Sequence, residues 1–284
     1  MPIAPVIKEP EALITWAEEQ HRGGHTIGVV PTMGYLHEGH VSLVRRAKAE
    51  CARVVASIFV NPTQFGPKED LARYPRDLGG DLAKLSAAGV DLVFVPEKEA
   101  MYPAGFDTYV VPGEIASTLC GASRPGHFRG VATVVLMLLR MARADRAYFG
   151  EKDFQQLAVI RRMAKDLWLG VDVIGCPIVR EPDGLAMSSR NVYLSPRERA
   201  QAVCLSQALA AVANRVAAGE RHAEALRALM RTMIEAADTA RVDYVEVVDA
   251  LTLRPITTLD RDALAAVAVF FGKTRLIDNR QLHI

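Results

Sequence analysis

The sequence lacks an excess of charge of either sign and lacks paired cysteines. Its 34 lysines and arginines nearly balance its 33 aspartates and glutamates, which leaves a net charge of +1. No broad field of one sign therefore draws the chain to nucleic acid or to an anionic membrane surface. The four cysteines lie far apart and form no C-x-x-C pair. We therefore expect neither a zinc site nor a redox motif, and a reducing compartment such as the cytoplasm.

Long apolar runs are also lacking. The longest, from Ala263 to Phe271, falls far short of the roughly 20 residues that span a bilayer. Glutamates at the start of the chain make a signal peptide unexpected. What is present, 284 residues of which 50% are apolar and 24% charged, is typical of a globular protein with one large or two ordinary domains.

Short β-branched runs alternate with longer runs of helical period over the first part of the chain. The predicted strands are 26–30, 54–60, 90–95, 146–149 and 171–175. The predicted helices are 39–50, 76–88, 131–143 and 154–169, with Asp153 as N-cap and Gly170 as C-terminal glycine of the last. This alternation predicts an α/β fold with a doubly wound, parallel, Rossmann-like sheet. Such sheets bind ligands at the carboxyl ends of their strands.

The pattern changes after about residue 177. Helices are predicted at 196–218 and 221–237, and strands at 242–248, 263–271 and, as a short piece, 275–277. We therefore predict two domains, 1–176 and 177–284, of which the second is a smaller α+β domain. A cleft between two domains is a frequent ligand site.

The stretch "PTMGYLHEGH", residues 31–40, lies where a predicted strand gives way to a helix. Gly34 and Gly39 allow the backbone to bend and to approach a ligand closely. A helix that begins near Gly39 would direct free N–H groups and a partial positive charge at the loop. With His37 and His40 beside it, the stretch has the pattern of a phosphate cradle. A pair of solvated loop histidines would explain the same residues.

Two other stretches offer donors to anions. In "YFGEKDFQQL", Lys152 lies in the turn after a strand, and Gln156 lies in the first helical turn, where its amide both donates and accepts. In "MSSRN", Ser188, Ser189 and Arg190 would form a mobile clamp on an anion. Taken alone, a capping turn with a solvated lysine and a linker with ordinary turn residues are the simpler interpretations.

Two amides and a basic group complete the signals. Asn61 and Gln64 follow the strand 54–60 at its carboxyl end, where uncharged amides suit a small polar substrate. Arg124, His127 and Arg129 lie among glycines before an apolar helix and offer another anion site. A turn built on Asn61 and a plain basic loop are the alternatives. The arrangement of these stretches around strand ends is a stronger signal than any one of them.

Together these motifs resemble the pantoate–β-alanine ligase family, within the HxGH-and-KMSKS nucleotidyltransferases. "PTMGYLHEGH", "SIFVNPTQF", "YPRD", "HFRGVATVV", "FGEKDFQQL" and "MSSRN" occur in that family's order over nearly the whole chain, and the closing "TRLIDN" also fits. The resemblance implies that residues 1–176 bind nucleotide and pantoate and that 177–284 close over the ATP site. It implies that ATP and pantoate give pantoyl-adenylate and pyrophosphate, and that β-alanine then gives pantothenate and AMP. Mg²⁺ on the phosphates and a cytoplasmic homodimer are further implications.

The resemblance also assigns roles to residues. His40 would be the proton donor, and the catalytic donors would be His37, His40, Lys152, Ser188, Ser189 and Arg190. The ATP site would comprise Met33, Gly34, Tyr35, Leu36, His37, Glu38, Gly39, His40, Gly150, Glu151, Lys152, Asp153, Val179, Met187, Ser188, Ser189 and Arg190. The substrate residues would be Gln64 on pantoate and β-alanine, Gln156 on pantoate, and Asn61, Tyr74 and Arg129 nearby.

Two departures and three alternatives qualify the resemblance. A synthetase-type KMSKS loop has lysines, whereas "MSSR" offers only Arg190. In this it resembles the pantoate ligases. Gly79-Gly80-Asp81 has fewer carboxylates than the family often shows there, so the metal ligands stay open. Another small-molecule adenylyl- or cytidylyltransferase of the same fold is the alternative, although it would not be expected to pair Gln64 with Gln156. An aminoacyl-tRNA synthetase would need a tRNA-reading domain, and a non-catalytic regulatory module would be expected to lack a phosphate donor.

Overall fold

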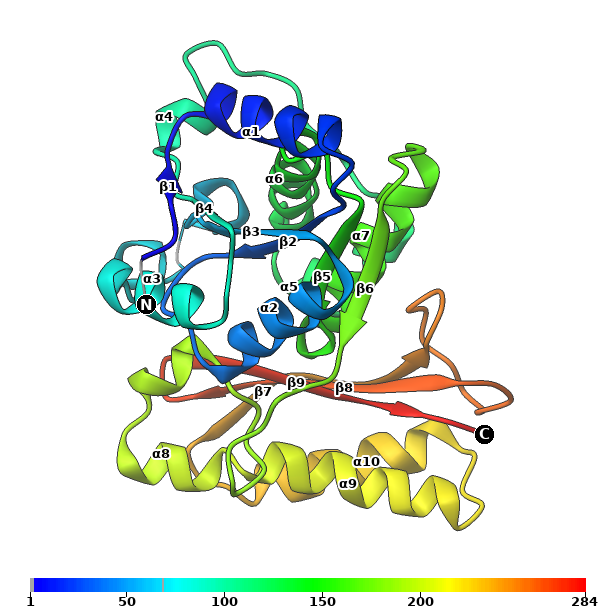
Figure 1. The fold of residues 1–284 in the computed structure, drawn as a ribbon. Coiled ribbons are helices and arrows are strands. Elements are labelled where there is room, and N and C mark those ends of the chain that lie inside the picture. The colour runs from blue at the N-terminus through cyan, green and yellow to red at the C-terminus, as the bar shows by residue number, and fades with distance from the viewer. Residues whose placement is uncertain (1–2, 68) are drawn as a thin grey trace. The chain divides into compact units, whose positions relative to one another are not determined.

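The computed structural model describes residues 3–67 and 69–284, and the chain divides into two compact units (Figure 1). The first unit comprises Met1–Pro112, Arg124–Glu151 and Val159–Pro177, and the second comprises Gly113–Ser123, Lys152–Ala158 and Ile178–Ile284. Two short segments from the earlier part of the chain thus belong with the C-terminal unit. The sequence alone predicted a single boundary, after residue 176.

The first unit is built on a six-stranded sheet whose paired neighbours run parallel, in the order β1-β4-β3-β2-β5-β6. Its strands are β1 (Val6–Ile7), β2 (Ile27–Thr32), β3 (Arg53–Ile58), β4 (Leu92–Phe94), β5 (Arg146–Gly150) and β6 (Asp172–Cys176). The chain runs from β2 outward to β3 and β4 and then returns to the other side of β2 as β5. The predicted doubly wound sheet is confirmed, and its switch point lies at the carboxyl ends of β2 and β5.

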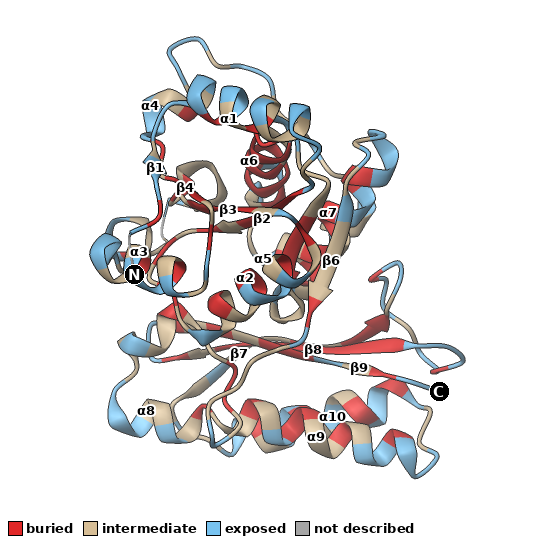
Figure 2. Ribbon diagram, in the orientation of Figure 1, coloured by how far each residue is buried: buried red, intermediate tan, exposed pale blue. Residues whose placement is uncertain are grey.

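Helices cover both faces of this sheet (Figure 1). They are α1 (Pro10–Arg22), α2 (Glu38–Glu50), α3 (Leu78–Ala87), α4 (Lys98–Met101), α6 (His127–Met141) and the later part of α7 (Phe154–Asp166). Helix α1 packs with α6 and α2 packs with α3, and the central strands between them are buried (Figure 2). Helix α6 begins at His127, earlier than predicted, because Gly126 adopts a left-handed conformation with φ 83° and reverses the chain there.

The second unit contains an antiparallel sheet of β7 (Ala240–Asp249), β8 (Ala263–Phe271) and β9 (Thr274–Leu282) in that order. Helices α9 (Cys204–Ala217) and α10 (Ala223–Glu235) bury one face. Helix α5 (Leu119–Ser123) and the start of α7 pack on the other. Strand β8 is therefore covered on both faces, which explains its unbroken apolar sequence.

Two predicted elements of this unit are corrected. The helix predicted at 196–218 is two helices, α8 (Pro196–Gln201) and α9, because Ala202 and Val203 tighten the turn between them while keeping near-helical angles. Strand β9 is longer than the predicted piece at 275–277. None of the helices in the described part of the chain combines the length and the apolar character needed to cross a membrane.

Candidate active site

The loop after β2 carries the first group of predicted site residues and begins at the switch point of the sheet. The Thr32 hydroxyl donates to Ser57 O at 2.6 Å and accepts from Gly34 N at 3.2 Å. Gly34 and Tyr35 both have positive φ, 82° and 52°. A non-glycine residue adopts this conformation only at a cost in free energy. The loop is therefore a tight, constrained turn that leads into α2.

His37 and His40 lie together at the start of α2, with their ring centroids 4.1 Å apart. Nδ1 of His37 accepts from Gly39 N at 3.2 Å, and Nδ1 of His40 accepts from His37 N at 3.3 Å. These two bonds cap the helix reciprocally. A ring nitrogen that accepts a hydrogen bond carries no proton, so each neutral ring has its proton on Nε2. The caps thus hold both imidazoles as Nε2–H donors.

Five backbone N–H groups of this loop, those of residues 34–37 and 39, are bound by side chains of the protein, in contrast to the free groups of the expected phosphate cradle. Those of Tyr35 and Leu36 donate to the carboxylate of Asp81, each at 2.7 Å. The Thr32 hydroxyl accepts from the N–H of Gly34, and the two imidazoles accept from the N–H groups of residues 37 and 39. The expectation of free N–H donors is therefore wrong for these groups, because the chain supplies its own side-chain acceptors.

The loop after β3 brings Asn61 and Gln64 together, in and beside the short turn Pro62–Gln64. Asn61 is 1% exposed, and its Nδ2 donates to Gln64 Oε1 at 3.0 Å and to Gly130 O at 3.2 Å. Its Oδ1 accepts from the Tyr102 hydroxyl at 2.8 Å. Burial raises the pKa of Tyr102, so the phenol stays protonated and donates. With its oxygen held, Gln64 directs its Nε2 to Met33 Sδ at 3.2 Å, a weak acceptor.

The basic stretch before α6 supports the backbone of Gln64. His127 Nδ1 lies 2.8 Å from Gln64 O, and Arg124 Nη2 donates to the same oxygen at 3.3 Å. Arg124 also forms an ion pair with Glu69 at 2.6 Å. Arg129 is exposed, and its guanidinium lies over a tyrosine ring at 4.3 Å. Arg124 and His127 therefore hold the amide turn in place, and Arg129 alone of the three is exposed.

In the second unit, a narrow turn brings Val179 and Met187 together. Met187 N donates to Val179 O at 3.0 Å. Arg180 anchors this turn to β9 through paired bonds to Asp278 at 2.6 and 3.0 Å. Ser188 follows and caps the short helix Ser189–Tyr193 by accepting from the N–H of the residue after next at 3.2 Å. The predicted "MSSR" residues thus extend from a turn that β9 holds.

Strand β9 also holds the turn after β5. Asn279 Nδ2 donates to Lys152 O at 2.8 Å. The neighbouring start of α7 is anchored by Gln155, whose Nε2 donates to two carbonyl groups of the segment 113–123 at 3.1 and 2.8 Å. Asp278 and Asn279, from the closing "TRLIDN" motif, therefore gather Lys152, Val179 and Met187 within one unit.

The remaining predicted residues are placed as follows. Leu36 and Tyr74 are buried, whereas Glu38 is exposed and bound to Arg45. Gly150 is the last residue of β5, and Glu151 begins the short turn Glu151–Asp153. Asp153 is exposed, and Gln156 is half-buried in the first turn of α7. The side chains of Leu36 and Glu38 thus serve the fold and the surface.

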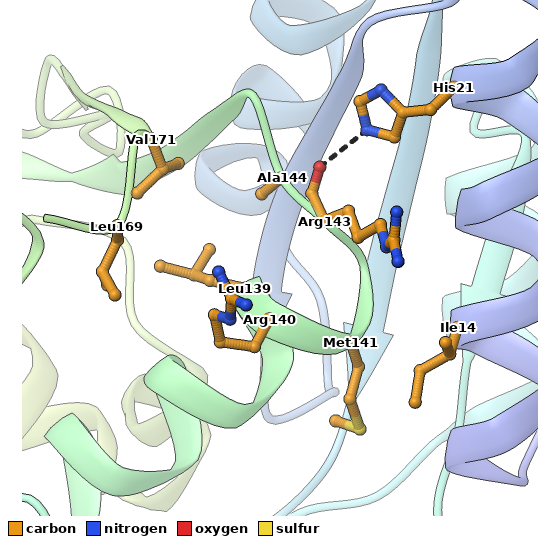
Figure 3. Close-up of a pocket in the computed structure, with 9 residues that line it drawn as sticks. All are labelled: Ile14, His21, Leu139, Arg140, Met141, Arg143, Ala144, Leu169 and Val171. Carbon is orange, nitrogen blue, oxygen red and sulfur yellow. Dashed lines mark hydrogen bonds between the residues drawn. The ribbon is translucent and has the colours of Figure 1, made fainter.

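A separate cavity of about 790 Å³ lies at the other end of the parallel sheet (Figure 3). It is lined by His21 of α1, by the end of α6 and by the residues that precede β5 and β6, such as Ala144 and Val171. The His21 ring lies 2.9 Å from Arg143 O at its edge. Ligands of doubly wound sheets bind at the carboxyl ends of the strands, so this cavity is not part of the predicted site.

Sequence reasoning missed the residues that hold the predicted ones. Asp81 was considered only as a possible metal contact, and Tyr102 and Asp278 were not singled out. A signal existed for Asp278, because "TRLIDN" matched the family without any assigned role. Asp81 is distinguished only by its burial in the structure, which the sequence does not show.

Comparisons with known proteins agree over nearly the whole chain. The family model for pantoate–β-alanine ligase matches residues 5–281. A pantothenate synthetase from Roseiflexus sp. is 62% identical over 89% of this chain and 91% of its own, and one from Heliobacterium modesticaldum is 54% identical over 98% and 99%.

Solved structures give the same result. The crystal structure of a pantothenate synthetase from Thermus thermophilus matches with a TM-score of 0.93 and 47% identity, over 99% of this chain and 100% of that one. That of a pantoate–β-alanine ligase from Francisella tularensis, complexed with β,γ-ATP and β-alanine, matches with a TM-score of 0.79 and 34% identity, over 98% and 97%.

Proposed function

The chain belongs to the pantoate–β-alanine ligase family, and from this premise we propose how its residues carry out the reaction. The activity is the ATP-dependent joining of pantoate to β-alanine, which releases AMP and pyrophosphate through a pantoyl-adenylate. The observation that carries the proposal is the pair of capped histidines after β2 together with the oriented amide of Gln64 after β3, whose Nε2 contacts Met33 of the histidine loop, at the carboxyl ends of two paired parallel strands.

The amide of Gln64 binds the substrate oxygens. Asn61 holds Gln64 Oε1 at 3.0 Å, so the Nε2 group faces outward as a donor. Its present acceptor, Met33 Sδ, is weak, and a pantoate oxygen replaces it with a gain in hydrogen-bond strength. Asn61 itself is satisfied by protein groups on both ends, so it acts through Gln64. This refines its expected role as a direct substrate contact.

The histidines act on the phosphates. When the pantoate carboxylate attacks the α-phosphorus, negative charge grows on the phosphoryl oxygens and on the departing pyrophosphate. Preorganised donors aimed at such charge are usually the largest catalytic contribution, and loss of one costs about 10²–10³ in rate. Nε2–H of His37 and His40 supply two such donors. His40 donates a hydrogen bond from Nε2–H to the leaving pyrophosphate. Because its Nδ1 is occupied by the cap, its proton-donor role is carried by Nε2.

Residues of the second unit add cationic and hydroxyl donors. Lys152 supplies a point charge, and Ser188, Ser189 and Arg190 supply the hydroxyls and guanidinium of a clamp on the nucleotide. Val179 and Met187 contribute to its ATP site with backbone and apolar contacts, and Gln156 binds pantoate. These roles rest on the family's motifs and on the order that β9 imposes on the residues within their own unit.

Mg²⁺ accompanies ATP in this proposal. Among the residues that the structure describes, no group of three or more His, Cys, Asp or Glu side chains is arranged to hold a metal ion. Mg²⁺ in nucleotide sites keeps several waters and binds largely to substrate phosphates. The residues present fit an ion held chiefly by the nucleotide, where it would offset phosphate charge. Titration of activity with EDTA and Mg²⁺ tests this.

An omission assay tests the function. Purified protein is incubated with ATP, Mg²⁺ and pantoate, and pyrophosphate and AMP are followed with and without β-alanine. We expect one equivalent of pyrophosphate per site without β-alanine and continuous AMP once it is added. If neither product forms in either tube, the ligase assignment is wrong. Pyrophosphate formation with another acceptor in place of pantoate would indicate a different adenylyltransferase.

A cytoplasmic homodimer is the assembly that we propose from the family resemblance. Light scattering of the purified protein gives its mass directly, and a mass near twice the 31.0 kDa of one chain is expected. A monomer at micromolar concentration would contradict it. Cell fractionation of the source organism, followed by immunodetection, tests the compartment.

A further inference from the structure

We propose that Asp81, together with Lys84 one turn along α3, is a positioning residue that holds the loop of His37 and His40, and is not a metal ligand. The inference rests on the proposed function, because it concerns how the phosphate donors of that reaction are held. It assigns a role to helix α3, which the sequence motifs left without one.

Both carboxylate oxygens of Asp81 accept hydrogen bonds from the loop. It is 1% exposed, and its Oδ2 accepts from Tyr35 N and its Oδ1 from Leu36 N, each at 2.7 Å. Hydrogen bonds to a charged acceptor are shorter and about twice as strong as neutral ones. Lys84 Nζ donates to Leu36 O at 2.7 Å. Two charged side chains on one helix thus bind both the N–H and the C=O of the peptide backbone just before His37.

The three hydrogen bonds from Asp81 and Lys84, called the clamp below, are needed because the backbone of the loop is constrained. Tyr35 has φ 52°, a left-handed conformation that costs a non-glycine residue free energy. Gly34, with φ 82°, has no side chain, and a Cβ there would lie 3.0 Å from Asp81 Oδ2. Glycine therefore allows the carboxylate to come close enough to bind the next two N–H groups. Without the carboxylate, the left-handed turn loses the bonds that offset its cost.

The clamp bears on catalysis through the histidine that follows it. His37 comes directly after Leu36, and its N–H and ring nitrogen both take part in the cap that orients the two imidazoles. A relaxed turn shifts this cap relative to the sheet. A misplacement of about 1 Å in a donor costs about 10²-fold in rate.

A metal ligand would have a different environment. Both Asp81 oxygens already accept backbone N–H groups, and the ammonium of Lys84 binds the same loop. A divalent cation on the remaining lone pairs would compete with these N–H donors for the charge of one carboxylate and would meet a positive charge nearby. Positions 79 and 80 of helix α3 are glycine, and the carboxylate one turn earlier, that of Asp77, is engaged as the N-cap of the helix, where it accepts from Gly80 N at 3.0 Å.

Three variants test the proposal. In Asp81→Asn, one backbone N–H would face an amide NH₂ in place of an acceptor. Lys84→Met removes the other bond at an exposed position, where folding is not at risk. The matched control is Asp91→Asn, because Asp91 Oδ2 also accepts from a backbone N–H, that of Val54 at 2.8 Å, and from a lysine, Lys48 at 2.8 Å, elsewhere in the same unit.

The readouts are kcat and KM for each substrate, ATP binding by calorimetry, the Mg²⁺ concentration for half-maximal activity, and Tm. We expect Asp81→Asn to lose about 10²-fold in kcat/KM for ATP and Lys84→Met about tenfold. The KM for β-alanine and the Mg²⁺ midpoint should stay as in the wild type. Asp91→Asn should lower Tm but keep kcat/KM within twofold.

Three results would overturn the proposal. They are full kcat/KM for ATP in both clamp variants, recovery of the Asp81→Asn enzyme with excess Mg²⁺, and an equal loss of activity in Asp91→Asn. Calorimetry measures ATP binding whether or not the protein makes pantothenate, so it separates failure of the clamp from failure of the ligase assignment. If the wild type binds ATP but makes no pantothenate, the ligase assignment fails, and weaker ATP binding by the clamp variants would still support the clamp.

Discussion

Gly130→Ala probes the contact between α6 and the amide turn most sharply. A Cβ at Gly130 would lie 2.4 Å from Thr63 O, 2.5 Å from Thr63 C and 2.6 Å from Gln64 N. These are backbone atoms, so no side-chain rotation relieves the overlap. Since ordinary contacts to a Cβ begin at 3.4 Å, the turn must move by about 1 Å. Gly130 thus permits the close approach that carries Gln64 to its position.

Two effects on stability oppose each other. Alanine in a helix is favoured over glycine by up to about 1 kcal/mol, whereas overpacking costs about 1–3 kcal/mol. We therefore expect a net loss of about 1–2 kcal/mol in the free energy of unfolding. The displacement of Gln64 should lower kcat/KM for pantoate by about 10²-fold.

The assay compares Gly130→Ala with Gly79→Ala. Gly79 lies in helix α3, and a Cβ there meets nothing within 4 Å. Urea denaturation gives stability, and steady-state kinetics with varied pantoate gives kcat/KM. Gly79→Ala should be as stable as the wild type or more so, with unchanged kinetics. Wild-type kcat/KM for pantoate in Gly130→Ala would refute the argument that this contact sets the position of Gln64.

Three further predictions follow from the same geometry. His40→Ala should lower kcat by about 10²–10⁴-fold with only a small drop in Tm from the lost capping bond to His37 N, and full activity would rule out its role on the leaving group. Asp278→Asn leaves Arg180 without its ion-pair partner; because Arg180 is 30% exposed, we expect a loss of about 2–3 kcal/mol in urea denaturation, and weaker ATP binding. Burial by itself raises the pKa of Glu69, but the bonds and charge of Arg124 outweigh it and hold that pKa below its usual value. The pair therefore stabilises the fold above the usual pKa of about 4.3 and less as pH falls through the lowered value, so the Tm gap between wild type and Glu69→Gln should narrow from pH 6 to pH 3.

The sheet was predictable because buried parallel strands are apolar runs bounded by helices. Strand β8 follows the same rule, since both of its faces are covered. Helix α1 was missed because it buries only Leu13 and Ala17, which leaves little periodicity, and β1 is only two residues long. The allocation of segments 113–123 and 152–158 to the second unit depends on tertiary contacts, which no local pattern records.

The candidate site was predictable in its residues more than in its hydrogen bonds. Polar side chains after β2, β3 and β5 could be placed at one edge because carboxyl ends of parallel strands meet there. The direction of the Gln64 amide depends on Asn61, whose burial follows from the approach of α6. The loss of free N–H groups before α2 depends on the rotamers of His37 and His40 and on Asp81, which sequence spacing does not determine.

The measurement that tests the central claim most directly is the fate of oxygen from the pantoate carboxylate. Pantoate labelled with ¹⁸O in its carboxylate is turned over with ATP and β-alanine, and the products are analysed by mass spectrometry. If a pantoyl-adenylate forms, attack of the amine on its carbonyl leaves one ¹⁸O in each AMP and none in pyrophosphate. Unlabelled AMP, or label in inorganic phosphate or pyrophosphate, would contradict the adenylate route and with it the roles assigned to the two histidines.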